Sequence, residues 1–144
     1  RGQAKGITAA KQKNYVEGRL GLIIDGTGKD ADKILYQKNM LDELGYDTYM
    51  IFVNTSIDVA LQRNTERPRS LPNDDVVKMW KSVQANIGQF SNIFRQGFIV
   101  VDNNDAGEDV FKEVYKRVKG LLRRKVQNTR AKDWMASELA KKQR

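Results

Sequence analysis

The order of patterns along the chain predicts an α/β protein with a parallel sheet and helices on both faces of that sheet. Three short apolar runs have the character of buried strands, and helical patterns follow each of them. The 144 residues are the length of one ordinary domain. A doubly wound sheet usually has about five strands, so three strands predict a sheet that is incomplete in this chain.

The first strand is expected in Leu20–Gly28, where an apolar run ends in a polar, glycine-rich turn. Apolar residues on both faces are typical of a buried parallel strand. A helix follows, capped by Asp30 or Asp32 and running to about Leu44, with Gly45 as its stop. The inner face of this helix is expected to contain Ile34, Leu35, Leu41 and Leu44.

A second strand is predicted over Tyr46–Val53, because β-branched and aromatic residues dominate that segment. Asn54-Thr55-Ser56 then caps a short helix. Its apolar residues recur with helical spacing at Ile57, Ala60 and Leu61. Arg63–Pro72 contains both prolines of the chain and is predicted to be a loop, because proline cannot continue a helix.

A long helix is predicted from Asn73, because apolar residues recur at alternating steps of four and three. The stripe is expected to be core and consists of Val76, Trp80, Val83, Ile87, Phe90 and Phe94. Gly97–Asp102 is the third predicted strand, and a final amphipathic helix runs to about Val126. The inward residues of that helix are expected to be Val110, Val114, Val118, Leu121 and Leu122. We expect residues 1–127 to form the α/β domain and residues 128–144 a basic helical tail.

The absence of cysteine and histidine excludes whole classes of chemistry. Disulfides, thiolate nucleophiles, imidazole bases and metals bound by cysteine or histidine all need residues that this chain lacks. The remaining carboxylates, hydroxyls, lysines and arginines suit oxygen-ligated Mg²⁺ and phosphate groups. No apolar run approaches the roughly 18 residues of a membrane span, and the N-terminus has no apolar signal region, so we expect a cytoplasmic protein without a membrane partner.

The net charge of +8 is unevenly distributed. Residues 1–19 carry +4, residues 20–109 carry −5 and residues 110–144 carry +9. The basic residues of the last segment can bind nucleic acid. They lack interleaved aromatic residues for base stacking, so the solvated face of an amphipathic helix is the favoured interpretation. They include Lys116, Arg117, Lys119, Arg123, Arg124, Lys125, Arg130 and Lys132.

Polar residues follow each predicted strand, where ligands gather in open α/β sheets. The first such end, Asp25-Gly26-Thr27-Gly28, combines a carboxylate, a flexible backbone and a hydroxyl. Asp25 can bind hydrated Mg²⁺ or accept a proton, and the two glycines let backbone N–H groups approach an anion. Asp and Gly are also common in ordinary turns, so a plain turn is the alternative.

Three arginines and no lysine lie in the seven residues from Arg63 to Arg69. Arg63 and Arg67 are four residues apart, and Arg69 follows the break at Pro68. Guanidinium groups on a loop can close over a transferring phosphoryl group and neutralise its developing charge. The alternative is a solvated basic loop with Glu66 as a partner. We favour phosphate recognition, because the guanidinium fork suits bidentate contacts.

Three segments together resemble the C-terminal two thirds of zeta-toxin-like P-loop kinases, including phage-encoded members. They are Leu22–Gly28, Tyr49–Thr55, and Val59–Arg63 with Arg67-Pro68-Arg69. The resemblance covers about residues 15–125. It implies a three-layer P-loop kinase-like fold and a kinase that transfers the γ-phosphate of ATP to a small hydroxyl-bearing or nucleotide-like acceptor. For a phage-encoded member, the expected location is the host cytoplasm.

The resemblance also implies a nucleotide site. Asp25, Gly26 and Thr27 match the acid-Gly-Thr that such kinases place beside the phosphates and Mg²⁺. Asn103 and Asn104 fall where related kinases line the adenine pocket.

The lid of the family is implied in the same way. Arg63, Arg67 and Arg69 match the lid arginines that clamp ATP and stabilise the transferring phosphoryl group. These three residues are therefore the expected catalytic group.

The phosphate-binding loop of the family is not found in this chain. Gly28-Lys29 does not complete the pattern G-x-x-x-x-G-K-[ST], because Ile23 stands five residues before Gly28 and Asp30 follows Lys29. Because the chain opens with Arg1, we expect a piece of a longer protein whose first strand, phosphate loop and substrate-side acid lie upstream. One half of a split kinase, completed by a partner chain that carries the loop, is an alternative.

Overall fold

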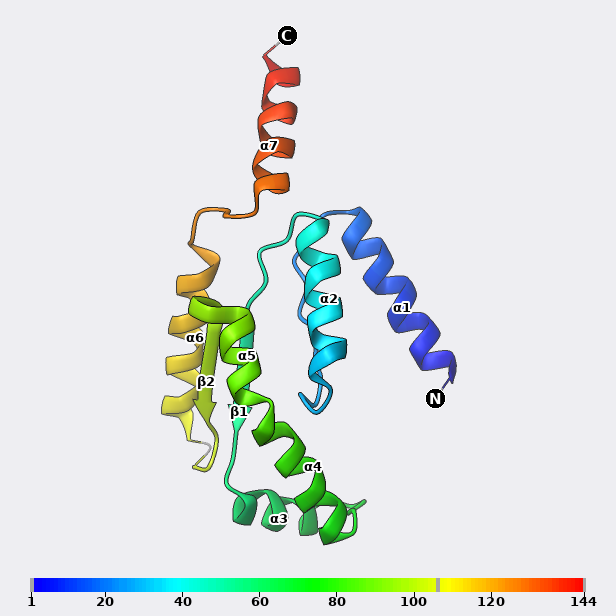
Figure 1. The fold of residues 1–144 in the computed structure, drawn as a ribbon, viewed down its shortest axis with the longest axis vertical. Coiled ribbons are helices and arrows are strands. Elements are labelled where there is room, and N and C mark those ends of the chain that lie inside the picture. The colour runs from blue at the N-terminus through cyan, green and yellow to red at the C-terminus, as the bar shows by residue number, and fades with distance from the viewer. Residues whose placement is uncertain (1, 106, 144) are drawn as a thin grey trace.

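The computed structural model describes residues 2–105 and 107–143, which fold into a mixed α/β protein that is mostly helical (Figure 1). Within these residues, two strands form one small parallel sheet. The elements in chain order are α1 (Gly2–Glu17), α2 (Ala31–Glu43), β1 (Met50–Asn54), α3 (Ile57–Thr65), α4 (Asn73–Ala85), α5 (Ile87–Phe94), the 3₁₀ helix η1 (Arg95–Gly97), β2 (Phe98–Asp102), α6 (Glu108–Leu122) and α7 (Thr129–Lys142).

The sheet confirms two of the three predicted strands. β1 and β2 run parallel, and their register joins Met50 with Phe98 at one end and Asn54 with Asp102 at the other. β1 begins at Met50, four residues later than Tyr46, where the prediction began. Parallel strands require a long crossover, and here α3, α4 and α5 lie between the two strands in the chain.

Helices pack against both faces of this sheet. On one face, Phe52 of β1 and the fully buried Phe90 of α5 belong to one apolar cluster, with ring centroids 6.3 Å apart. On the other face, Ile99 and Val101 of β2 pack against Leu121 of α6. Neighbouring residues of a strand point to opposite faces, so each cluster uses alternate residues of its strand.

The prediction of a strand in Leu20–Gly28 is wrong. Residues 20–27 have no regular secondary structure, and the Ile23 side chain is fully exposed. The Leu20 carbonyl accepts a hydrogen bond from the Tyr46 hydroxyl. A strand is stable only with ladder hydrogen bonds to a neighbour, and within the described ranges β1 and β2 pair only with each other. An apolar run therefore exists here without the partner that would make it a strand.

The prediction of one long helix from Asn73 is also wrong, because the helix is interrupted at Asn86. The Asn86 side chain donates a hydrogen bond to the carbonyl of Gly28. α4 and α5 keep the helical phase across the interruption, so the apolar stripe continues. Phe90 is its only fully buried member, and the other five residues of the stripe are half-buried.

The predicted helix caps are confirmed at two positions. The Asp30 carboxylate accepts from the backbone N–H of Lys33, and the Ser56 hydroxyl accepts from that of Val59. Two predicted inward residues are exposed instead, Leu44 and Leu122. Leu44 follows the end of α2 as its C-cap, and Leu122 ends α6 one position, or about 100°, away from the buried Leu121.

The two terminal helices α1 and α7 project from the body of the molecule (Figure 1). Neither α1 nor α7 contains a buried residue. The start of α7 is nevertheless fixed, because the Asn128 side chain donates to the carbonyls of Asp42 and Tyr46, and Asp47 accepts from the backbone N–H groups of Gln127 and Asn128. Nowhere in the described ranges does a helix have both the length and the apolar character needed to cross a bilayer.

Candidate functional site

The polar loops after β1 and β2 meet at the carboxyl ends of the strands. The backbone N–H of Asn103 donates to the carbonyl of Asn54 at 2.8 Å, and that of Ser56 donates to Oδ1 of Asn104 at 2.7 Å. Asp102 Oδ1 accepts from both nitrogens of Asn104, which closes a tight Asx turn. Residues almost 50 positions apart in the sequence thus form one polar cluster.

Arg63 reaches this cluster from α3. Ser56 caps the helix, and Arg63 stands seven residues later, about two turns on, so it lies on the same side as the cap. Its Nη2 donates to the carbonyls of Asn103 at 2.7 Å and Asn104 at 3.2 Å, in a half-buried environment. The structure therefore brings together three of the predicted site residues.

The two asparagines differ in what they offer a ligand. The Asn104 side chain is occupied, because its oxygen accepts from Ser56 and its nitrogen donates to Asp102. The Asn103 side chain forms no hydrogen bond within the described part of the chain, although its backbone N–H and carbonyl are both paired. Asn103 therefore carries the amide that can bind a polar group from outside.

Two residues of α4 support the cluster and were not predicted as site residues. The Trp80 indole N–H donates to the carbonyl of Thr55 at 2.9 Å, and Gln84 Nε2 donates to Oδ1 of Asn54 at 2.7 Å. The sequence prediction placed Trp80 in the apolar core stripe. The signal that was available is Gln84, a polar residue one turn after Trp80 on the same side of the helix.

Arg67 and Arg69 lie on the exposed loop between α3 and α4, residues 66–72. The predicted loop began at Arg63, but α3 continues to Thr65, because the first proline comes only at Pro68. Neither guanidinium group forms a hydrogen bond or an ion pair with another residue that the structure describes. The α3–α4 pair stands at the end of the molecule to which the carboxyl ends of the strands point (Figure 1). The loop that carries the two arginines joins α3 to α4, and neither side chain is bonded to the polar cluster.

Asp25, Gly26 and Thr27 are exposed and form no hydrogen bond or ion pair with the arginines in the described chain. A Cβ added at Gly26 would meet no atom within 4 Å, so no backbone cradle encloses this position. Gly28 is different: its φ of +71° needs glycine, and it lies against the Phe52 and Phe90 rings. The segment is therefore fixed at Gly28, and its three candidate residues extend into solvent.

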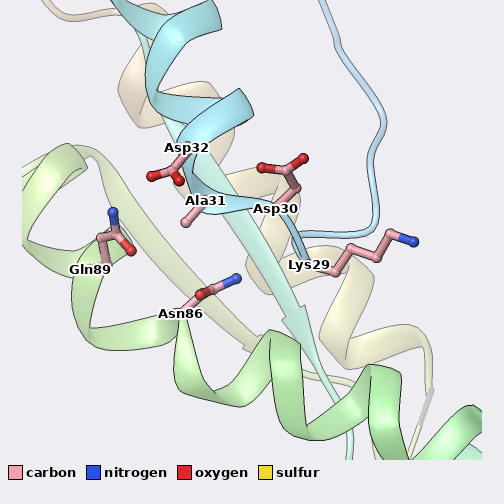
Figure 2. Close-up of a pocket in the computed structure, with 6 residues that line it drawn as sticks. All are labelled: Lys29, Asp30, Ala31, Asp32, Asn86 and Gln89. Carbon is pink, nitrogen blue, oxygen red and sulfur yellow. The ribbon is translucent and has the colours of Figure 1, made fainter.

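An open pocket of about 470 Å³ lies beside this segment. In Figure 2, Asn86 and Gln89 face the first turn of α2, while the Lys29 side chain extends away from them. The N-terminus of α2 is already capped by the Asp30 carboxylate, and Asp32 adds a second negative charge. These two carboxylates outnumber the single ammonium group of Lys29 at the pocket, which disfavours the binding of a phosphate there.

No group of three or more carboxylates within the described ranges is arranged to hold a metal ion by itself. Asp25, the predicted metal ligand, is a single exposed carboxylate. Comparison of the chain with protein-family models, curated proteins and solved structures found no match.

The contact between Arg63 and the loop after β2 leads to a prediction about stability. Arg63→Ala leaves the carbonyls of Asn103 and Asn104 without their donor, so we expect the free energy of unfolding to fall by about 1–3 kcal/mol. Urea denaturation followed by circular dichroism measures the loss. Arg67→Ala is the matched control, because that side chain makes no such bonds, and it should change stability by less than about 0.5 kcal/mol. Equal effects of the two substitutions would contradict a bridging role for Arg63.

Proposed function

We propose that residues 15–125 form the distal, lid-bearing part of an ATP-dependent kinase with a three-layer P-loop kinase fold. One observation carries the proposal: Arg63 joins the arginine-bearing helix to the loop after β2, at the carboxyl ends of parallel strands. Ligands of open α/β sheets bind at that edge. The sequence resemblance to zeta-toxin-like kinases independently points to the same residues.

The arrangement supports different roles for the three arginines. Arg67 and Arg69 are exposed, so they serve as the lid residues that contact the triphosphate and stabilise charge on the transferring group. The guanidinium of Arg63 is engaged by two carbonyls, which favours a positioning role. Asn103 contributes an amide to the nucleotide, and Asn104 holds the loop that presents Asn103.

The residues proposed to hold Mg²⁺ fit that ion in their chemistry. Mg²⁺ in nucleotide sites is usually bound through one or two carboxylates together with phosphate oxygens and water. Asp25 supplies an exposed carboxylate and Thr27 an exposed hydroxyl two residues later. When bound, Mg²⁺–ATP supplies the phosphoryl group and neutralises part of its charge. The acceptor hydroxyl takes this group, which leaves ADP and releases the hydroxyl proton.

One edge of β1 is available for the strand that would carry the phosphate loop. β2 pairs with one edge of β1, and within the described residues no strand occupies the other. Ile51 and Val53 lie on the face covered by α6, yet they are 42% and 58% exposed, because α6 packs on β2. We propose that a strand followed by G-x-x-x-x-G-K-[ST], from residues preceding Arg1 or from a partner chain, pairs with this edge.

The proposed strand addition predicts a context-dependent effect of Val53→Lys. In the chain of 144 residues, the substitution should change stability by less than about 0.5 kcal/mol, because the site is exposed. Once the added strand and its helix cover Val53, the buried lysine should cost at least about 2 kcal/mol. The measurement is urea denaturation of the chain alone and of the chain completed by the phosphate-loop segment.

Phe111→Lys is the control for that comparison, since Phe111 is exposed on α6, the helix that packs on β2. It should behave alike in the two contexts. If Val53→Lys also has the same effect in both, the added strand does not lie on this edge.

The function itself is tested by phosphoryl transfer from ATP labelled at the γ-phosphate. The assay uses the full chain together with the segment encoded directly before Arg1, and offers small polyols and nucleoside monophosphates as acceptors. We expect Mg²⁺-dependent labelling of an acceptor that is lost when the lysine of the phosphate loop is replaced. If neither that segment nor a co-purifying partner contains a strand followed by G-x-x-x-x-G-K-[ST], the kinase proposal fails.

A further inference from the structure

Asn64 combines burial with polarity. It is 5% exposed, and within the part of the chain that the structure describes it is the one polar residue that is buried. Burying an amide without partners is unfavourable, so its neighbours show what it stabilises. Asn64 Nδ2 donates to the carbonyl of Leu71 at 2.8 Å, and the backbone N–H of Leu71 donates to Asn64 Oδ1 at 3.0 Å. The nitrogen and the oxygen of the amide are therefore both bonded to backbone groups of a single residue.

This pair of bonds closes the loop between α3 and α4. Asn64 lies at the end of α3, Leu71 stands two residues before α4, and the six residues between them include both Arg67 and Arg69. A planar amide bonded to an N–H and a carbonyl of the same residue fixes orientation as well as distance. The two ends of the loop are thus joined by a pair of hydrogen bonds, as two paired residues of a β-sheet are joined. The arginine side chains remain in solvent.

Two further features restrict the same loop. The backbone N–H of Arg67 donates to the carbonyl of Asn64, which starts the loop with a turn. Pro68 and Pro72 have fixed φ angles, and the Pro72 carbonyl accepts from Asp75 at the start of α4. The backbone that carries the two arginines therefore has few conformations available.

We propose that Asn64 is a positioning residue that holds the loop of Arg67 and Arg69 in place for a phosphate-bearing ligand. The inference rests on the proposed function, because the ligand is taken to be the triphosphate of ATP. A loop fixed beforehand loses less conformational entropy on binding, and the arginines then meet the phosphate in the reactive geometry. Without the amide pair, the arginines remain present but are no longer held at the required distance.

The first test measures loop opening and does not depend on activity. Trypsin cleaves after arginine and lysine but not before proline. Between Asn64 and Pro72, the Arg67–Pro68 bond is therefore resistant, and Arg69–Ser70 is the bond that trypsin can cleave. For Asn64→Ala we expect native-state cleavage at Arg69–Ser70 to accelerate by at least about tenfold. Asn92→Ala, an exposed asparagine on α5, is the matched control and should leave the rate unchanged.

The second test separates positioning from general support of the fold. In the phosphoryl-transfer assay, Asn64→Ala should lower kcat by about 100-fold, with KM for the acceptor changed little. Asn64→Asp keeps an acceptor for the Leu71 N–H but sets a carboxylate oxygen against the Leu71 carbonyl, so it is a second disruptive variant. If Asn64→Ala unfolds, Asn64→Gln is the milder variant. Asn64→Gln retains the same amide and should recover part of kcat.

Each result has a distinct meaning. Unchanged cleavage at Arg69–Ser70 in both Asn64→Ala and Asn64→Asp overturns the loop-holding role, whatever the activity. Faster cleavage with an unchanged kcat overturns the positioning role and leaves the kinase proposal intact. If the unsubstituted, completed protein transfers no phosphate, the kinase proposal fails and the positioning of arginines for ATP fails with it, while the cleavage rates still decide whether Asn64 holds the loop.

Discussion

Replacing Arg67 and Arg69 together with alanine is expected to lower kcat for phosphoryl transfer by about 1,000-fold, the range found for arginines that stabilise a transferring phosphoryl group. The melting temperature should stay nearly constant, because both side chains are exposed and form no hydrogen bond or ion pair among the described residues. Steady-state transfer from labelled ATP and thermal unfolding of the same samples measure the two effects.

The control for this pair is Arg123→Ala, an exposed arginine after α6 that is far from the α3–α4 loop in the sequence. It should leave kcat unchanged. Arg67→Lys with Arg69→Lys keeps the charges but loses the planar fork, so most of the loss should remain. Unchanged kcat in the double alanine variant would remove Arg67 and Arg69 from the proposed lid.

The largest loss of stability is expected from Phe90→Ala. Phe90 is fully buried, its ring centroid lies 6.3 Å from that of Phe52, and a Cβ added at Gly28 would lie 3.8 Å from the Phe90 ring. Removing a buried phenylalanine ring costs about 3–5 kcal/mol, which is a large part of the stability of an ordinary domain. Urea denaturation followed by circular dichroism should show the midpoint moving to much lower urea.

Phe111→Ala makes the same chemical change at an exposed site on α6 and serves as the control. It should alter the free energy of unfolding by less than about 0.5 kcal/mol. A loss below about 1 kcal/mol for Phe90→Ala would mean that this cluster is not the main core of the protein.

Local sequence patterns correctly predicted the elements that are stabilised by residues close to them in the sequence. Asp30 and Ser56 cap their helices as expected, because a cap is made with residues only a few positions away. The apolar run in Leu20–Gly28 predicted a strand that is absent, because a strand also needs a neighbour that local sequence cannot specify. The interruption at Asn86 could not be predicted from local sequence either, because the Asn86 side chain donates a hydrogen bond to the carbonyl of Gly28, 58 residues earlier.

The contacts of the candidate site also fall into two groups, those that the sequence could predict and those that it could not. The meeting of Arg63 with Asn103 and Asn104 follows from a rule of topology, because the carboxyl ends of parallel strands share one edge of the sheet. The roles of Trp80 and Asn64 depend on single hydrogen bonds from side chains to distant backbone groups or across a loop. No periodicity in the sequence reports such bonds, so these residues were found only in the structure.

Arg63 and Asn64 are consecutive residues near the end of α3, and they hold different loops. The first is bonded to the carbonyls of Asn103 and Asn104, and the second to both backbone groups of Leu71. The loop after β2 and the arginine loop therefore share one anchor and cannot shift independently without breaking hydrogen bonds. In the proposed kinase, a nucleotide base that displaces the first loop would also shift the second, so α3 would couple base recognition to the arginines proposed to contact the phosphates.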